Sequence, residues 1–104
     1  MPPTTLGEFE QLVLLALLRL GEDAYGVTLC QDIADRTGRD VSLGSVYKTL
    51  ERLEDKGLVA SRVGEPTAER GGRRKKHYRL QALGQQALQQ SLAALRNMTE
   101  GLEI

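Results

Sequence analysis

The chain has 104 residues, a formal net charge of zero, one cysteine and one histidine. This length fits one domain, and a lone cysteine excludes an internal disulfide. One Cys and one His are too few for an intramolecular structural zinc site, so no metal or cofactor is expected. The longest unbroken apolar run, residues 12–18, is far too short to span a membrane. We therefore expect a cytoplasmic protein.

The first predicted helix starts near Thr5 and is apolar on almost every side up to Leu20. Thr5 and Glu8 have the spacing of a capping box, which marks a helix start. A helix this apolar has to be covered on two sides. One cover is the domain's own core, and we predict a second subunit as the other, because few elements remain to wrap the helix. The alternative is a central helix wrapped by its own domain.

A turn at residues 21–26 leads into a second predicted helix at about residues 26–37, with Asp23 as a candidate cap and Gly38 as a C-terminal stop. A third helix is predicted over residues 42–56, with Ser42 as its cap and a left-handed Gly57 at its end. Its apolar residues recur at three- and four-residue steps and line one face: Leu43, Val46, Leu50 and Leu53. Two short helices, a tight turn and a third helix form a helix-turn-helix arrangement.

The opposite face of the third helix shows Ser45, Lys48, Thr49 and Arg52, with Tyr47 on its flank. Its first two turns carry no acidic residue. Donors and positive charge at the start of a helix suit the DNA major groove, where the first residues of a recognition helix meet base edges. The alternative is an ordinary amphipathic helix.

A change of periodicity after Gly57 predicts a β-hairpin. Residues 58–63 have the β-branched residues and partial alternation of a strand, and residues 75–80 form the returning strand. The glycines and proline of residues 64–72 predict the connecting loop. A hairpin directly after a recognition helix is a wing.

The positive charge is concentrated on this wing. Residues 70–79 hold six of the fourteen Lys and Arg and no acid. A basic run is often only a solvated loop, but like charges this close repel one another unless phosphates or other anions neutralise them. We expect two of the arginines to enter the minor groove and the lysines to meet backbone oxygens. The predicted wing contacts are Arg70, Arg73, Arg74, Lys75 and Lys76.

The last predicted helix runs from Ala82 to about Thr99. Its later apolar residues follow at alternating four- and three-residue steps, which is typical of a short coiled-coil seam. Because so short a seam needs help, we expect the first helix to share the interface. The predicted dimer contacts are Phe9, Val13, Leu17, Leu88, Leu92, Leu95 and Leu102. The alternative is packing of this helix on its own domain only.

Several segments together resemble the PadR-like family of transcriptional regulators. They are residues 6–10 before the leucine-rich helix, residues 24–26, the fairly specific string at residues 44–58, and the wing at residues 70–80. The resemblance implies a dimeric winged-helix DNA-binding protein, usually a repressor, whose first and last helices form the dimer interface. It implies the short branch of the family, with one C-terminal helix.

Carried over residue by residue, the resemblance places Gly44, Ser45, Tyr47 and Lys48 at the DNA-facing start of the recognition helix. Many members have Pro where this chain has Lys48, which here adds a cation. Many have a Thr cap before the last helix, whereas this chain has Gln81, so the start of that helix is less well defined.

The expected fold is mainly α with a small β-hairpin: a winged helix-turn-helix of three helices and a two-stranded wing in residues 1–81, and a C-terminal dimerisation helix in residues 82–104. The expected function is a homodimeric, sequence-specific regulator of double-stranded DNA at a pseudo-palindromic site. The alternative is a winged-helix protein-interaction module, disfavoured because aromatic anchors are few: one Phe, three Tyr and no Trp. The residues offer no constellation for an enzyme. The sequence is also compatible with a small-molecule effector, whose identity it does not indicate.

Overall fold

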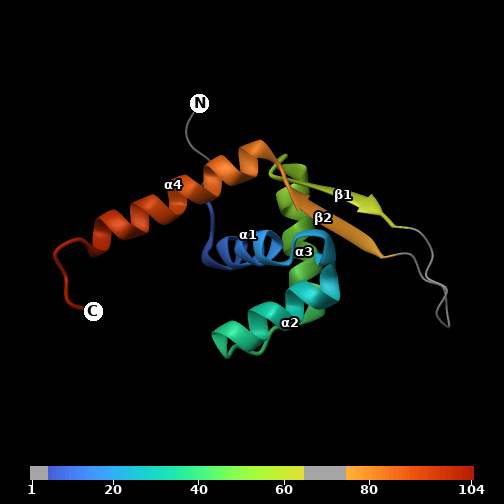
Figure 1. The fold of residues 1–104 in the computed structure, drawn as a ribbon, viewed down its shortest axis with the longest axis horizontal. Coiled ribbons are helices and arrows are strands. Elements are labelled where there is room, and N and C mark those ends of the chain that lie inside the picture. Colours follow the sequence, from blue (N-terminus) through green and yellow to red (C-terminus); the bar gives the residue numbers. More distant parts are fainter. Residues whose placement is uncertain (1–4, 65–74) are drawn as a thin grey trace.

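The computed structural model of the chain describes residues 5–64 and 75–104 (Figure 1). Two antiparallel strands, paired from Val59 with Leu80 to Val63 with Lys76, follow three helices and precede a fourth. This is the predicted winged helix-turn-helix with one C-terminal helix. The elements are α1 (Glu8–Leu20), a 3₁₀ turn η1 (Gly21–Asp23), α2 (Gly26–Thr37), α3 (Leu43–Asp55), β1 (Val59–Val63), β2 (Lys76–Leu80) and α4 (Ala82–Thr99).

Helix α3 begins and ends where its sequence predicts. The Ser42 hydroxyl accepts a hydrogen bond from the Ser45 N–H at 3.1 Å, which satisfies one of the unpaired donors of the first turn. At the other end, Gly57 has φ +77°, a left-handed conformation that lets the chain leave the helix at little cost.

The caps predicted for α1 and α2 are wrong. Helix α1 begins after Gly7 rather than Thr5, and the Gly7 N–H donates to Glu10 Oε1 at 2.9 Å. Helix α2 begins after Tyr25 rather than Asp23, and the Tyr25 N–H donates to the Thr28 hydroxyl at 3.1 Å. In both helices the third residue reaches back to the cap backbone, which is the half of a capping box that needs no polar side chain at the cap itself.

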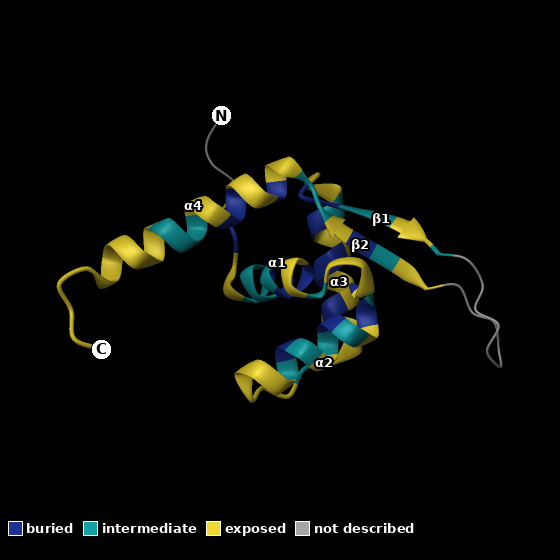
Figure 2. Cartoon of the chain, viewed as in Figure 1, coloured by how far each residue is buried: buried dark blue, intermediate teal, exposed yellow. Residues whose placement is uncertain are grey.

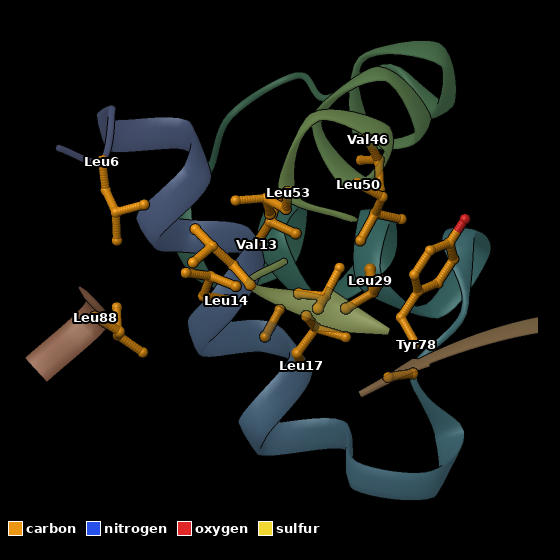
Figure 3. Packing of buried hydrophobic residues seen from close by; sticks show 14 of the residues in the cluster. Leu6, Val13, Leu14, Leu17, Leu29, Val46, Leu50, Leu53, Tyr78 and Leu88 are labelled. Atoms are coloured by element: carbon orange, nitrogen blue, oxygen red, sulfur yellow. The ribbon is translucent and has the colours of Figure 1, made fainter. Parts of the chain in front are cut away.

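The core lies where α1 crosses α2, α3 and the sheet (Figure 3). Val13, Leu17 and Leu88, predicted as dimer contacts, are only 0%, 3% and 2% exposed in the single chain. They are therefore core residues, and that part of the interface prediction is wrong. Periodicity could not separate them from interface residues, because α1 is apolar on nearly all sides.

The base of the wing is joined to the start of α2. The Tyr78 N–H donates to the Ala24 carbonyl at 2.9 Å, and Tyr25 forms a β-bridge with His77. Nδ1 of His77 also lies 2.9 Å from the Glu22 carbonyl oxygen. Strand β2 is thus held between β1 and the chain leading into α2, which fixes the direction in which the wing leaves the domain.

Helix α4 packs on the domain through its first half (Figure 2). Gly84, Ala87 and Leu88 are buried, and Leu92 is half-buried against the core. From residue 94 onward the helix projects from the domain and is exposed. At Gly84 the helix lies so close to the chain that an added Cβ would be 2.1 Å from the Leu58 carbonyl oxygen. The first turn of α4 is therefore set directly on the junction between α3 and β1.

An ion pair joins the start of α1 to the end of α3. Glu10 is 8% exposed, and its Oε2 lies 3.0 Å from Nζ of Lys56. Burial alone would raise the pKa of Glu10, but the Gly7 N–H, the Lys56 ammonium and the more distant Arg52 together outweigh it and lower this pKa below its ordinary value of 4.5. The ionised carboxylate is consequently favoured in the folded chain.

A Glu10→Gln variant is expected to be less stable than wild type by about 1–2 kcal/mol at pH 7, because it loses a largely buried charged hydrogen bond. Since the pKa of Glu10 is lower in the folded than in the unfolded chain, its contribution is present above pH 4.5 and disappears as the pH falls through the folded pKa. Urea unfolding of both proteins at pH 7 and pH 3 measures this difference.

Glu8→Gln is the matched control, because Glu8 makes an ion pair with Arg39 but its side chain is 69% exposed. It should change stability by less than about 0.5 kcal/mol at either pH. A Glu10→Gln deficit that persisted unchanged at pH 3 would contradict the electrostatic explanation.

Candidate nucleic-acid interface

The start of α3 presents an exposed surface without acidic residues. Gly44, Ser45, Tyr47 and Lys48 are all exposed, and the acids of this helix first appear at Glu51. The positive end of the helix dipole and the side-chain donors therefore face outward together. This is the geometry expected of a helix that enters a groove with its N-terminal end.

Thr49, predicted to face DNA, is instead buried at 2% exposure. It lies on the buried face of α3 beside Leu50 and Leu53. The buried face therefore includes one residue more than the apolar periodicity indicated. Its hydroxyl accepts a hydrogen bond from Nη2 of Arg52 at 3.2 Å. Thr49 therefore orients the exposed Arg52 and does not itself reach a ligand.

A shallow hollow of about 390 Å³ lies along one flank of α3. Three cationic side chains, Arg39, Lys48 and Arg52, line it together with Phe9 from α1. Arg39 was not predicted from the sequence, because it stands alone in the connection between α2 and α3. Nη2 of Arg39 makes an ion pair with Glu8 at 2.6 Å, and Asp40 also lines the hollow, so two acids partly offset the positive charge of this flank.

Tyr47 is held on the other flank by a glycine of α2. A Cβ added to Gly26 would lie 2.4 Å from both Cζ and the hydroxyl oxygen of the Tyr47 ring. Only a glycine at this position allows the ring to lie over the start of α2. This close approach gives a physical reason for the sequence of residues 24–26.

The two described lysines of the wing have different surroundings. Nζ of Lys75 lies 3.3 Å from the Tyr25 hydroxyl and 4.6 Å from the centre of that ring, a cation–π contact beside the start of α2. Nζ of Lys76 lies 3.8 Å from Oε1 of Glu54, toward the acidic end of α3. Lys75 is therefore the better placed of the two for an anionic ligand. Arg70, Arg73 and Arg74 lie outside the described residues.

Neither a metal site nor a membrane span is found in the part of the chain that the structure describes. Over residues 5–64 and 75–104, no group of three His, Cys, Asp or Glu side chains is arranged to hold a metal ion. Within the same residues, none of the helices has the length and apolar character needed to cross a membrane.

Comparison with known proteins agrees with the fold. The sequence profile of the transcriptional regulator PadR-like family matches residues 14–90. A solved PadR family transcriptional regulator from Eggerthella lenta is 31% identical, and the match covers 90% of this chain and 81% of that chain with a TM-score of 0.68. No curated protein is similar enough to count as a match.

Two further solved structures share the fold at lower identity. A PadR family transcription regulator from hypervirulent Clostridium difficile is 24% identical, with 90% of this chain and 93% of that chain covered and a TM-score of 0.75. A PadR-like transcriptional regulator from Bacillus cereus is 22% identical, with 89% and 92% covered and a TM-score of 0.64.

Proposed function

Because the chain belongs to the PadR-like family of transcriptional regulators, we propose that it is a homodimeric repressor that binds a pseudo-palindromic site on double-stranded DNA. The observation that carries this proposal is the exposed, acid-free start of α3, with a cationic flank on one side and Lys75 of the wing anchored at Tyr25. An arrangement of this kind supports reading of bases by the helix and neutralisation of phosphates on both sides of it.

Dimerisation is supported by apolar side chains that the single chain leaves uncovered. Leu95, Met98 and Leu102 are 53%, 77% and 62% exposed on α4 and just beyond it. Leu92 is half-buried at the edge of the core, whereas Phe9, which is also half-buried, lines the hollow beside α3 instead. A second subunit packed against α4 would cover these leucines and Met98 and present two recognition helices to half-sites roughly 34–36 Å apart.

Each subunit would divide its contacts between bases and backbone. We assign Ser45, Tyr47 and Lys48 to base edges, and Arg39, Arg52 and Lys75 to phosphates. Arg73 and Arg74 of the wing would enter the minor groove. If about four phosphates are neutralised per subunit, the logarithm of the binding constant of the dimer should fall against the logarithm of salt concentration with a slope near −7.

The double variant Arg73→Ala/Arg74→Ala tests this assignment. It should bind all DNA sequences more weakly, by roughly 100-fold at moderate salt. Its salt slope should fall to about −4, because the two arginines of each subunit would also neutralise the phosphates that flank the minor groove, and a dimer would lose four such neutralisations. Arg36→Ala is the control for loss of an arginine away from the wing: it removes one positive charge per subunit, from an α2 side chain paired with Asp32. Fluorescence anisotropy across a salt titration measures both quantities. A wild-type slope in the double variant would contradict a role for the wing.

The alternative, a protein-interaction module that does not bind DNA, makes a different prediction in a simpler experiment. The proposed regulator should be retained on immobilised calf-thymus DNA at low salt and released as salt is raised. A folded protein that passed through this column at low salt would exclude the proposed function and favour the alternative.

A further inference from the structure

Leu43 departs from its predicted place in the core. Its spacing with Val46, Leu50 and Leu53 predicts the buried face of α3, yet its side chain is 39% exposed whereas those three residues are fully buried. It is the first residue of α3 and follows directly after the Ser42 cap. An apolar side chain is thus presented at the end of the helix that we propose enters the groove.

The two serine hydroxyls at the start of α3 are already engaged. The hydroxyls of Ser42 and Ser45 lie 2.7 Å apart and hydrogen-bond to each other, and Ser42 also caps the helix. A Cβ added to Gly44 would have no neighbour within 4 Å, so the space beside the residue that follows Leu43 is open. Leu43 is therefore accessible at the exposed first turn of α3.

The side chains around the start of α3 are segregated by chemistry. Leu43 and Tyr47 are four residues apart, so they lie on the same side of the helix, and Tyr47 is 43% exposed. Lys48 and Arg52 lie on the other flank, beside the hollow that Arg39 shares. One flank is therefore apolar and the other cationic, so the two flanks would favour different base-edge groups.

A leucine can discriminate only by apolar contact. Among the groups that the four base pairs display in the major groove, the C5-methyl of thymine is the apolar one; the others are hydrogen-bond donors or acceptors. We propose that Leu43 is a specificity-determining residue that contacts a thymine methyl group in each half-site. This inference rests on the proposed function and adds the base that the apolar flank of α3 selects.

The test removes only the methyl group. Sites are first selected from random-sequence DNA with the wild-type protein, and each thymine of the selected site is then replaced by uracil in both half-sites. At the contacted position, uracil should lower the affinity of the wild-type dimer by roughly tenfold, because one methyl contact is lost in each of the two half-sites. Leu43→Ala should bind the thymine and uracil sites equally well there. Leu83→Ala, which shortens a leucine that is 50% exposed on α4, should keep the wild-type discrimination.

The outcomes separate this inference from the proposed function. If no sequence is enriched in the selection, sequence-specific DNA binding is excluded and the inference is overturned with it. If a site is enriched but no uracil substitution weakens wild-type binding, only the role of Leu43 is overturned. The same conclusion follows if Leu43→Ala, with a melting temperature close to wild type, retains the full uracil effect.

Discussion

Gly84→Ala is expected to destabilise the protein by about 2–4 kcal/mol. The added Cβ would lie 2.1 Å from the Leu58 carbonyl oxygen and 2.9 Å from Cδ1 of Leu80. Overpacking typically costs about 1–3 kcal/mol, and here the closest neighbour is backbone that cannot rotate away. The Leu58 carbonyl also accepts a hydrogen bond from the Gln81 N–H at 2.9 Å, so moving it disturbs the start of α4. Chemical unfolding at fixed protein concentration measures the loss.

The control for this substitution is Gly44→Ala. Gly44 lies in a helix, and a Cβ there would have no neighbour within 4 Å. Alanine should therefore raise the free energy of unfolding by about 0.5–1 kcal/mol, from helix propensity alone. Equal effects of the two substitutions would show that the close approach of α4 to Leu58 does not determine stability.

Leu95→Asp is expected to convert the proposed dimer into monomers and to weaken operator binding by roughly 10²–10⁴-fold. The side chain of Leu95 is 53% exposed in the single chain, so an aspartate there leaves the core intact. In a dimer, two carboxylates would enter an apolar seam, where an unpaired charge is poorly solvated. Monomers would then lose the gain in affinity from linking two half-site contacts. Analytical ultracentrifugation and anisotropy with the selected site give the two readouts.

Leu83→Asp on the same helix provides the comparison. Leu83 is 50% exposed, but it lies in the first turn, on the side of α4 away from Leu92 and Leu95. The Leu83→Asp protein should remain dimeric, and its operator affinity should stay within about threefold of the wild-type value. A Leu95→Asp protein that sedimented as a dimer would show that the seam lies elsewhere.

The sequence predicted the elements well where local chemistry determines them. Helix α3 begins at the Ser42 cap and ends before Gly57, as predicted, because a hydroxyl cap and a left-handed glycine act within one turn. Thr5 and Asp23 had equally good cap chemistry but do not cap α1 and α2. The helices begin after Gly7 and Tyr25 instead, where a side chain of the first turn accepts a hydrogen bond from the backbone N–H of the cap residue.

The candidate site was harder to predict, because exposure depends on what packs against each helix. Thr49 was expected to be exposed and Leu43 to be buried, but the polar Thr49 is buried and the apolar Leu43 is exposed. Burial of Thr49 is tolerated because its hydroxyl accepts a hydrogen bond from Arg52. Arg39 joins the site only through the folding of its connection against α1, and no periodic pattern marks a single arginine in a turn.

The exposed end of α4 has a consequence for how the amount of this protein would control its target. Helix α4 ends at Thr99, only eleven residues beyond Leu88, its last buried residue. A seam this short gives weak pairing, so subunits would exchange between free and paired forms within the cell's concentration range. Where most subunits are unpaired and the operator is mostly free, operator occupancy would rise with the square of subunit concentration. Doubling expression would then quadruple the paired form, and a modest change in synthesis would become a sharper change in repression.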